Sequence, residues 1–116
     1  MKLGCIGLVL LVFVTPAATE AGQDQPLQCD AGPLHRTFGG SRWAVYGCSD
    51  GTTLVVAAEK ANPAAPFYFI FHRKGNGYEL YGEGAGRKEF TKAAFEELRT
   101  LNERDISSLI AATRAK

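Results

Sequence analysis

Hydrophobic residues are spread unevenly along the chain, and their densest run lies near the N-terminus. Residues 3–14 are uninterruptedly apolar, with Lys2 before them and a stretch of small residues after them. An apolar core of roughly 7 to 15 residues is typical of a secretory signal peptide, whereas a membrane-spanning helix needs about 20. We therefore expect residues 1–21 to be a signal peptide cleaved after Ala21. The mature protein would then be periplasmic or secreted, with no stable membrane anchor, and the short leader suits a bacterial export signal.

The segment after the leader has no hydrophobic period. Residues 22–41 are rich in Gln, Asp, Pro and Gly and end in Gly39-Gly40-Ser41. This composition predicts an extended N-terminal arm. The periodic patterns begin after it, so residues 42–116 are expected to form a single domain.

Two runs whose successive side chains point to opposite faces then predict a β-hairpin. The two alternating runs, residues 43–48 and 53–58, flank Asp50-Gly51, which is a strong signal for a tight type I′ turn. With these two residues in the turn, one face of the hairpin carries Trp43, Val45, Leu54 and Val56. We assign this face to the core.

A second hairpin is predicted over residues 67–83, with its turn in Lys74-Gly75-Asn76-Gly77. Any loop of two or four residues places Phe69, Phe71 and Leu80 on one face. The opposite face then collects six candidate binding residues: Tyr68, Ile70, His72, Glu79, Tyr81 and Glu83.

The period changes to that of a helix from Thr91, which is the expected N-cap of a first helix with Phe95, Leu98 and Leu101 on its apolar side. Asn102 is the expected N-cap of a second helix. Its apolar stripe consists of Ile106, Leu109, Ile110 and Thr113. The fold class is therefore α+β: an antiparallel sheet of about four strands in two hairpins, followed by two C-terminal helices packed on one face.

Charge and cysteine content narrow the function classes. The 13 basic and 12 acidic residues leave a net charge of +1. This charge is too small to create the positive potential that attracts a nucleic acid. Removal of the leader leaves Cys29 and Cys48, an even number in an exported chain, so we expect one disulfide between them.

Known catalytic and metal-binding motifs are missing from the sequence, so we expect neither a cofactor nor a metal ion. His72 shares the second hairpin's polar face with Glu79, and a carboxylate beside an imidazole can serve as an acid/base pair. Such a pair suggests a small ribonuclease-like hydrolase, although Arg73 points to the opposite face and leaves the phosphate to Arg87 or Lys74. The plainer interpretation is an ordinary cross-strand surface pair.

Aromatic residues with polar tips on a sheet face that two helices leave open are typical of protein interfaces. We therefore expect a non-catalytic binding protein with a protein partner, for example an inhibitor or immunity-type protein acting on an envelope or secreted enzyme. Two alternatives stay open: the N-terminal arm folds over this face and buries it, or the face serves self-assembly of a structural envelope component.

One stretch of the chain resembles a known family. Residues 45–56, with Tyr46, Cys48, Asp50-Gly51 and Leu54 in order, are similar to the opening hairpin of the periplasmic c-type lysozyme inhibitors. The family's Ser-Gly inhibitory loop and Trp-x-Lys-Gly segment have no counterpart in the chain, so no inhibitory residue carries over. The resemblance implies a binding protein, whereas the two predicted helices differ from the family's all-β barrel.

Overall fold

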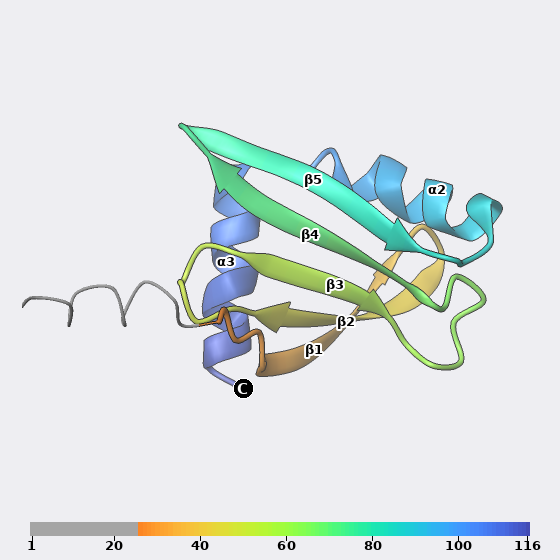
Figure 1. Ribbon diagram of the computed structural model, residues 1–116, viewed down its shortest axis with the longest axis horizontal. Helices are drawn as coiled ribbons and strands as arrows, with labels where there is room; N and C mark the ends of the chain where they lie inside the picture. Colours follow the sequence, from red (N-terminus) through yellow and green to blue (C-terminus); the bar gives the residue numbers. More distant parts are fainter. Residues whose placement is uncertain (1–25) are drawn as a thin grey trace, which may run out of the picture.

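The computed structural model describes residues 26–116, which form a five-stranded antiparallel sheet followed by two helices (Figure 1). The strands are β1 (Ala31–Phe38), β2 (Ser41–Gly47), β3 (Leu54–Ala58), β4 (Phe67–Lys74) and β5 (Gly77–Gly84), and the helices are α2 (Lys88–Leu98) and α3 (Glu103–Arg114). Each strand pairs with the next along the chain, so β1 and β5 are the edges. The predicted α+β class is confirmed. The expected signal peptide lies outside the described residues.

The sheet has one strand more than the four expected, and the additional strand is β1. It comes from the second half of the segment that the sequence indicated to be an extended arm, and it pairs with β2 through Leu34 opposite Val45 and Phe38 opposite Ser41. Only Leu34 and Phe38 are buried, and the three residues between them are exposed. Two apolar residues four positions apart give no alternation, which is why the pattern did not indicate a strand.

The predicted register of the first hairpin is confirmed, although its turn is wider. Val45 lies opposite Val56 and Gly47 opposite Leu54. The last bond of the hairpin runs from the Cys48 amide to the Thr53 carbonyl (3.1 Å), which leaves a four-residue loop instead of a two-residue type I′ turn. Two and four are both even, so the same side chains face the core.

The second hairpin has a two-residue turn, Gly75-Asn76, because Lys74 lies opposite Gly77. Gly75 has a φ of 59°, in the left-handed region that such turns need. Phe71 lies opposite Leu80, so the two share a face, as predicted for an even loop.

Both helices pack on the sheet face that carries the aliphatic and phenylalanine side chains. Among the most deeply buried residues are Trp43, Val45, Leu54, Val56, Phe69, Leu98 and Ile106. Two glycines allow the helices to approach closely. A Cβ on Gly47 would lie 2.3 Å from the Thr113 hydroxyl of α3, and one on Gly39 would lie 2.3 Å from the Ala94 amide of α2.

The first helix starts earlier than the sequence indicated. It begins at Lys88 with Arg87 at the N-cap, whose side chain makes no capping bond, so the assignment of Thr91 as N-cap was wrong. Thr91 is buried, and its hydroxyl donates to the Lys88 carbonyl (3.2 Å). Phe95, expected on the core side, keeps 36% of its surface exposed.

The second helix has the predicted cap. The Asn102 side chain accepts a hydrogen bond from the Asp105 amide (2.8 Å), and the Asp105 carboxylate accepts one from the Asn102 amide (3.0 Å). This reciprocal pair is a capping box, which fixes where α3 begins.

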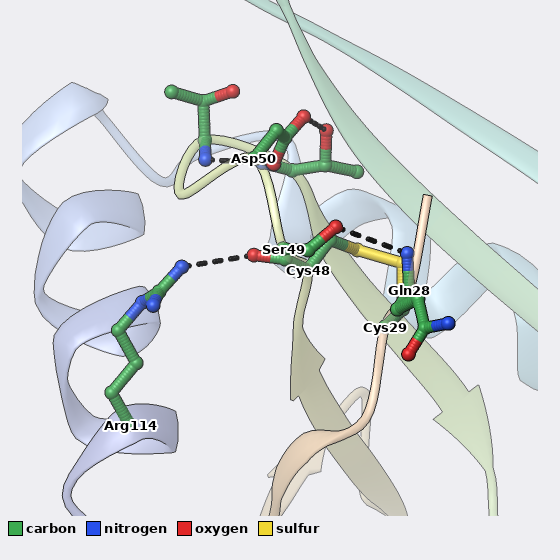
Figure 2. The surroundings of a disulfide bond; sticks show 8 residues. Gln28, Cys29, Cys48, Ser49, Asp50 and Arg114 are labelled. Atoms are coloured by element: carbon green, nitrogen blue, oxygen red, sulfur yellow. Dashed lines mark hydrogen bonds between the residues drawn. A yellow bond between two sulfur atoms is a disulfide. The ribbon is translucent and has the colours of Figure 1, made fainter. Parts of the chain in front are cut away.

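The disulfide joins Cys29 to Cys48, as predicted, and lies where three chain segments meet (Figure 2). The Ser49 amide donates to the Gln28 carbonyl (2.6 Å), and Arg114 of α3 donates to the Cys48 carbonyl (2.9 Å). We call this meeting point the disulfide corner. A structural disulfide is typical of an oxidising location outside the cytoplasm.

Loss of the α3 cap should destabilise the protein measurably. We expect Asn102→Ala to lower the free energy of unfolding by about 1 kcal/mol, because an amide of the first turn loses its acceptor. Urea unfolding followed by circular dichroism measures the change. Ser107→Ala, at an exposed position inside α3, is the control and should leave the midpoint nearly unchanged. Equal midpoints for all three proteins would contradict the capping role.

Asp50 should make the stability of the first hairpin depend on pH. Although partial burial alone raises the pKa of Asp50, hydrogen bonds from the Thr53 hydroxyl (2.6 Å) and from the Thr52 and Thr53 amides (both 2.9 Å) hold it below its ordinary value. The folded state therefore favours the carboxylate. Its stabilising contribution is complete above the unfolded pKa of about 3.9 and is lost as the pH falls through the lower folded pKa.

The test compares the wild-type protein with Asp50→Asn by urea unfolding at several pH values. The difference in free energy of unfolding should be largest near neutral pH and should shrink as the solution is acidified below pH 4. A difference that stays constant with pH would show that the charge of Asp50 does not contribute.

Candidate functional site

The sheet face that points away from the helices carries the candidate site. Strand pairing aligns the side chains of this face in rows across the sheet. One row runs from Tyr46 through Val55 and Ile70 to Tyr81. The next row consists of His35, Ala44, Ala57, Tyr68 and Glu83. We call this surface the tyrosine face, after Tyr46, Tyr68 and Tyr81.

The structure brings all six predicted binding residues to the tyrosine face. The pairings in the β4–β5 hairpin are Tyr68 with Glu83, Ile70 with Tyr81, and His72 with Glu79. Arg73 lies on the helix side, as expected, where it donates to Glu103 of α3 (2.8 Å). The placement follows from the two-residue turn, because an odd loop would have moved one strand's side chains to the other face.

Two hydroxyl–carboxylate pairs hold the tyrosines of β4 and β5 in place. The Tyr68 hydroxyl donates to Glu83 (2.9 Å), and the Tyr81 hydroxyl donates to Glu79. Each hydrogen bond raises the pKa of its tyrosine, because the neighbouring carboxylate disfavours the phenolate.

The Glu79 carboxylate has a second partner, since the Lys74 ammonium lies 2.9 Å from it. The pKa of Glu79 is lowered by the hydrogen bond from Tyr81 and then by Lys74, while the pKa of Lys74 is raised by Glu79. The result is a chain of three polar groups, Lys74, Glu79 and Tyr81, along the edge of the face.

Next to these pairs the tyrosine face is hollowed. A depression of about 270 Å³ is lined by Tyr68, Ile70, Tyr81, Gly82 and Glu83. Beside it, Ala44 and Ala57 leave a low floor in the centre of the sheet because their side chains are short. Tyr68 and Tyr81 are 38% and 52% exposed, so large aromatic surfaces border the hollow.

The described part of the N-terminal arm does not cover the tyrosine face. Residues 26–30 lie at the disulfide corner, where Gln28 bonds to Ser49, and β1 extends the sheet at its edge. Within residues 26–116, the helices contact β1, β2 and β3 from the other side. Residues 26–41, the described part of the arm, therefore do not bury the tyrosine face as one of the alternatives expected.

Glu79 is poorly suited to act as a general base beside His72. Glu79 bonds to Tyr81 and Lys74, and its lowered pKa moves it away from the near-neutral value that suits a general base. In the described residues no cluster of three or more His, Cys, Asp or Glu could hold a metal ion. Nor does any helix among residues 26–116 reach the length and hydrophobicity needed to cross a membrane.

Sequence reasoning missed a charged cluster at the β1–β3 end of the tyrosine face. The Glu59 carboxylate, just after β3, contacts His35 Nδ1 of β1 and lies 3.4 Å from Arg42 Nε of β2. The contact between His35 and Glu59 depends on β1 being a strand, so the cluster could not be found while these residues were taken as an arm.

Sequence reasoning also missed a groove on the helix side, between α2 and the β5 end of the sheet. It has a volume of about 370 Å³. Its lining includes Phe67, Phe69, Gly82, Lys88, Lys92 and Phe95. We call it the helix-side groove. Phe95 lines this groove and is partly exposed. The helical period alone predicts that Phe95 lies in the core, so it gives no sign of the groove.

These features define a small disulfide-linked α+β protein with helices on one sheet face and, on the other, an aromatic surface that residues 26–116 leave exposed. Comparison of the chain with protein-family models, with curated proteins and with solved structures finds no match. The chemistry and geometry of the site are therefore the basis for inferring a function.

The hydroxyl–carboxylate pairs can be tested one at a time. We expect Tyr68 and Tyr81 to ionise above the ordinary tyrosine pKa of about 10, because a carboxylate accepts a hydrogen bond from each hydroxyl. A pH titration of the tyrosine ring resonances by NMR measures both values. Glu83→Gln should lower the pKa of Tyr68 and leave that of Tyr81, and Glu79→Gln should do the reverse. Each variant is thus the control for the other, and unchanged values in both would contradict the pairing.

Proposed function

We propose that this protein is an exported, non-catalytic binding protein that holds a partner protein against its tyrosine face. The observation that carries the proposal is the aromatic surface formed by Tyr46, Tyr68, Ile70 and Tyr81, which the described residues leave uncovered. Tyrosine supplies a large apolar ring with a polar tip, and it is enriched in protein interfaces for that reason.

The polar partners of the tyrosines support binding because they fix the rings in advance. Immobilising a free side chain at an interface costs about 0.5 to 1.5 kcal/mol. Tyr68 is already tied to Glu83, and Tyr81 to Glu79, before any partner arrives. Association therefore orders less at these positions.

The shape of the tyrosine face favours a macromolecule over a small ligand. Five strands about 4.8 Å apart, with the longest having eight residues, make a surface of roughly 20 by 25 Å. Protein partners typically bury about 800 Å² each, which is of the same order as the area of this face. The hollow at Tyr68 and Tyr81 occupies only one part of the surface, where a partner's side chain can insert.

The charges on the face favour a protein over a nucleic acid. Glu59, Glu79 and Glu83 stand around the aromatic centre, with Arg42, Lys74 and the histidines between them. Carboxylates at this density repel a phosphate backbone, whereas a mixed polar rim is common in protein interfaces.

The proposed location is the bacterial periplasm or the extracellular space, based on the leader sequence and the disulfide. In that setting an inhibitor or immunity-type protein, acting on an envelope or secreted enzyme, suits the small size, the disulfide and a Glu79 that makes a poor general base.

The test is affinity capture from bacterial envelope and secreted fractions with the tagged protein. We expect a stoichiometric protein partner, and we expect Ile70→Ser with Tyr81→Ser to weaken its binding roughly tenfold or more, because truncated aromatic anchors cost the most. Hydroxyl-radical footprinting of the complex should show protection of Tyr68 and Tyr81.

The matched control is Leu27→Ser, which removes a hydrophobic side chain that is 50% exposed and lies outside the tyrosine face. It should bind as the wild-type protein does. Equal binding by the tyrosine-face variant would contradict the proposal. Cleavage of RNA that is lost in His72→Ala would establish the hydrolase instead, and self-association through the same residues would establish a structural component.

A further inference from the structure

We infer that the free edge of β5 accepts an extended segment of the partner protein as a sixth strand of the sheet. This inference deepens the proposed function, on which it rests, by naming the form in which the partner binds. Strand addition of this kind gains affinity from main-chain hydrogen bonds and specificity from pockets for alternate side chains.

The backbone of β5 is available for pairing. β5 is eight residues long, and among the described residues it pairs only with β4. Alternate residues of an antiparallel edge strand turn their amide and carbonyl groups outward. Tyr81, Gly82, Glu83 and Gly84 are all exposed, and the two glycines carry no side chain that would keep another backbone away.

The β5 edge also has a pocket on each side, and Gly82 lines both of them. The hollow of the tyrosine face lies on one side, and the helix-side groove on the other. Successive side chains of an added strand point to opposite faces, so one set would enter the hollow and the next set would enter the groove. Paired pockets at a single edge are the arrangement that an extended peptide requires.

Helix α2 is covered incompletely without such a strand. Phe95 of α2 is 36% exposed although its ring stacks on Phe69 at 6.3 Å between centroids, and it lines the helix-side groove together with Gly82 of β5. A sixth strand would lie next to β5 over this part of the helix. It would remove the ring of Phe95 from water and continue the packing that β4 begins.

The charges beside the two pockets define the chemistry of the segment. Glu83 lines the hollow on the tyrosine side, whereas Lys88 and Lys92 line the groove on the helix side. The occupant is therefore an extended segment with basic side chains on one face and apolar and acidic side chains on the other.

A second copy of the chain fits this edge poorly. In an antiparallel pair, directly opposite residues point to the same face. Pairing of two β5 strands about Tyr81 would place Glu79 of each copy opposite Glu83 of the other, and like charges directly opposite are destabilising. The same repulsion does not arise with a basic segment.

The experiment uses eight-residue peptides, the length of β5, capped at both ends and titrated into the purified protein by calorimetry. The matched peptide alternates lysine with leucine or glutamate. The control peptide has the same composition, but its lysines are adjacent in pairs and so are its other residues. As a strand it therefore carries lysine on both faces. We expect the matched peptide to bind at least tenfold more tightly. Equal affinities would overturn the inference.

Main-chain pairing is tested by N-methylation of the matched peptide on alternate residues, in two complementary versions. An added strand offers only one of its edges to β5, so one version should lose binding and the other should keep it. Binding of both versions with unchanged affinity would overturn the inference, because it would show contact through side chains alone.

Charge reversal in the protein tests the orientation. Glu83→Lys and Lys92→Glu should each weaken the matched peptide roughly fivefold. Asp30→Lys and Lys60→Glu are the controls, since both alter exposed charges away from β5 and should leave the affinity unchanged. If Glu83→Lys and Lys92→Glu bind the matched peptide as tightly as the control variants do, the peptide binds elsewhere and the inference is overturned.

The outcomes separate this inference from the proposed function. If Ile70→Ser with Tyr81→Ser weakens the captured partner but the peptides show no preference, the binding function stands and strand addition is overturned. If the free protein instead sediments as a dimer that Glu83→Lys strengthens, as the removal of the Glu79–Glu83 repulsion would do, the edge belongs to a second copy and the inference is likewise overturned.

Discussion

The parity of two turns determines what each face of the sheet carries. Along β4 the phenylalanines at 67, 69 and 71 alternate with Tyr68 and Ile70, so a slip of one residue would turn three phenylalanines to solvent. The β2–β3 loop has four residues and the β4–β5 turn has two, and both even lengths keep one register of faces across the sheet. Phenylalanine has no polar tip and is buried under the helices, whereas the hydroxyl of Tyr68 needs a polar partner and finds Glu83 on the open side.

The disulfide corner keeps this arrangement together at the end of the sheet where the helices contact it most. The bond between Cys29 and Cys48 fixes the start of β1 against the first turn, and closing a loop of this size contributes roughly 3 kcal/mol through the unfolded state. Arg114, near the end of the chain, bonds to the carbonyl of Cys48 (Figure 2). One corner therefore joins the first strand, the first hairpin and the last helix. Because β5 lies at the opposite edge, binding there need not disturb these contacts.

How much of the molecule the sequence predicts depends on whether the signal is local. The faces of both hairpins follow from two turn signals and an alternating pattern, and the cap of α3 follows from Asn102 with Asp105 three residues later. β1 has no such signal, because its stability comes from pairing with β2 and from two buried residues, Leu34 and Phe38. The start of α2 was missed for a similar reason: Arg87 makes no side-chain capping bond, so nothing in the residue type marks the position.

The site shows the same division. Strand parity alone predicts that the six candidate binding residues, three on β4 and three on β5, share a face. The helix-side groove instead depends on how α2 packs against the sheet, and no local sequence pattern predicts that packing. The helices contact β1, β2 and β3 most, and they leave the β5 end with apolar surface on both of its sides. A sheet edge with unpaired backbone groups and apolar surface on both sides favours pairing with another chain. Natural proteins usually protect such edges with charged side chains or cover them with a helix or loop. The charges that line the two pockets beside β5 have opposite sign, Glu83 at the hollow and Lys88 and Lys92 at the groove, so they admit a segment of complementary pattern more readily than a copy of the same strand. Protection against self-association and selection of a partner therefore follow from the same residues.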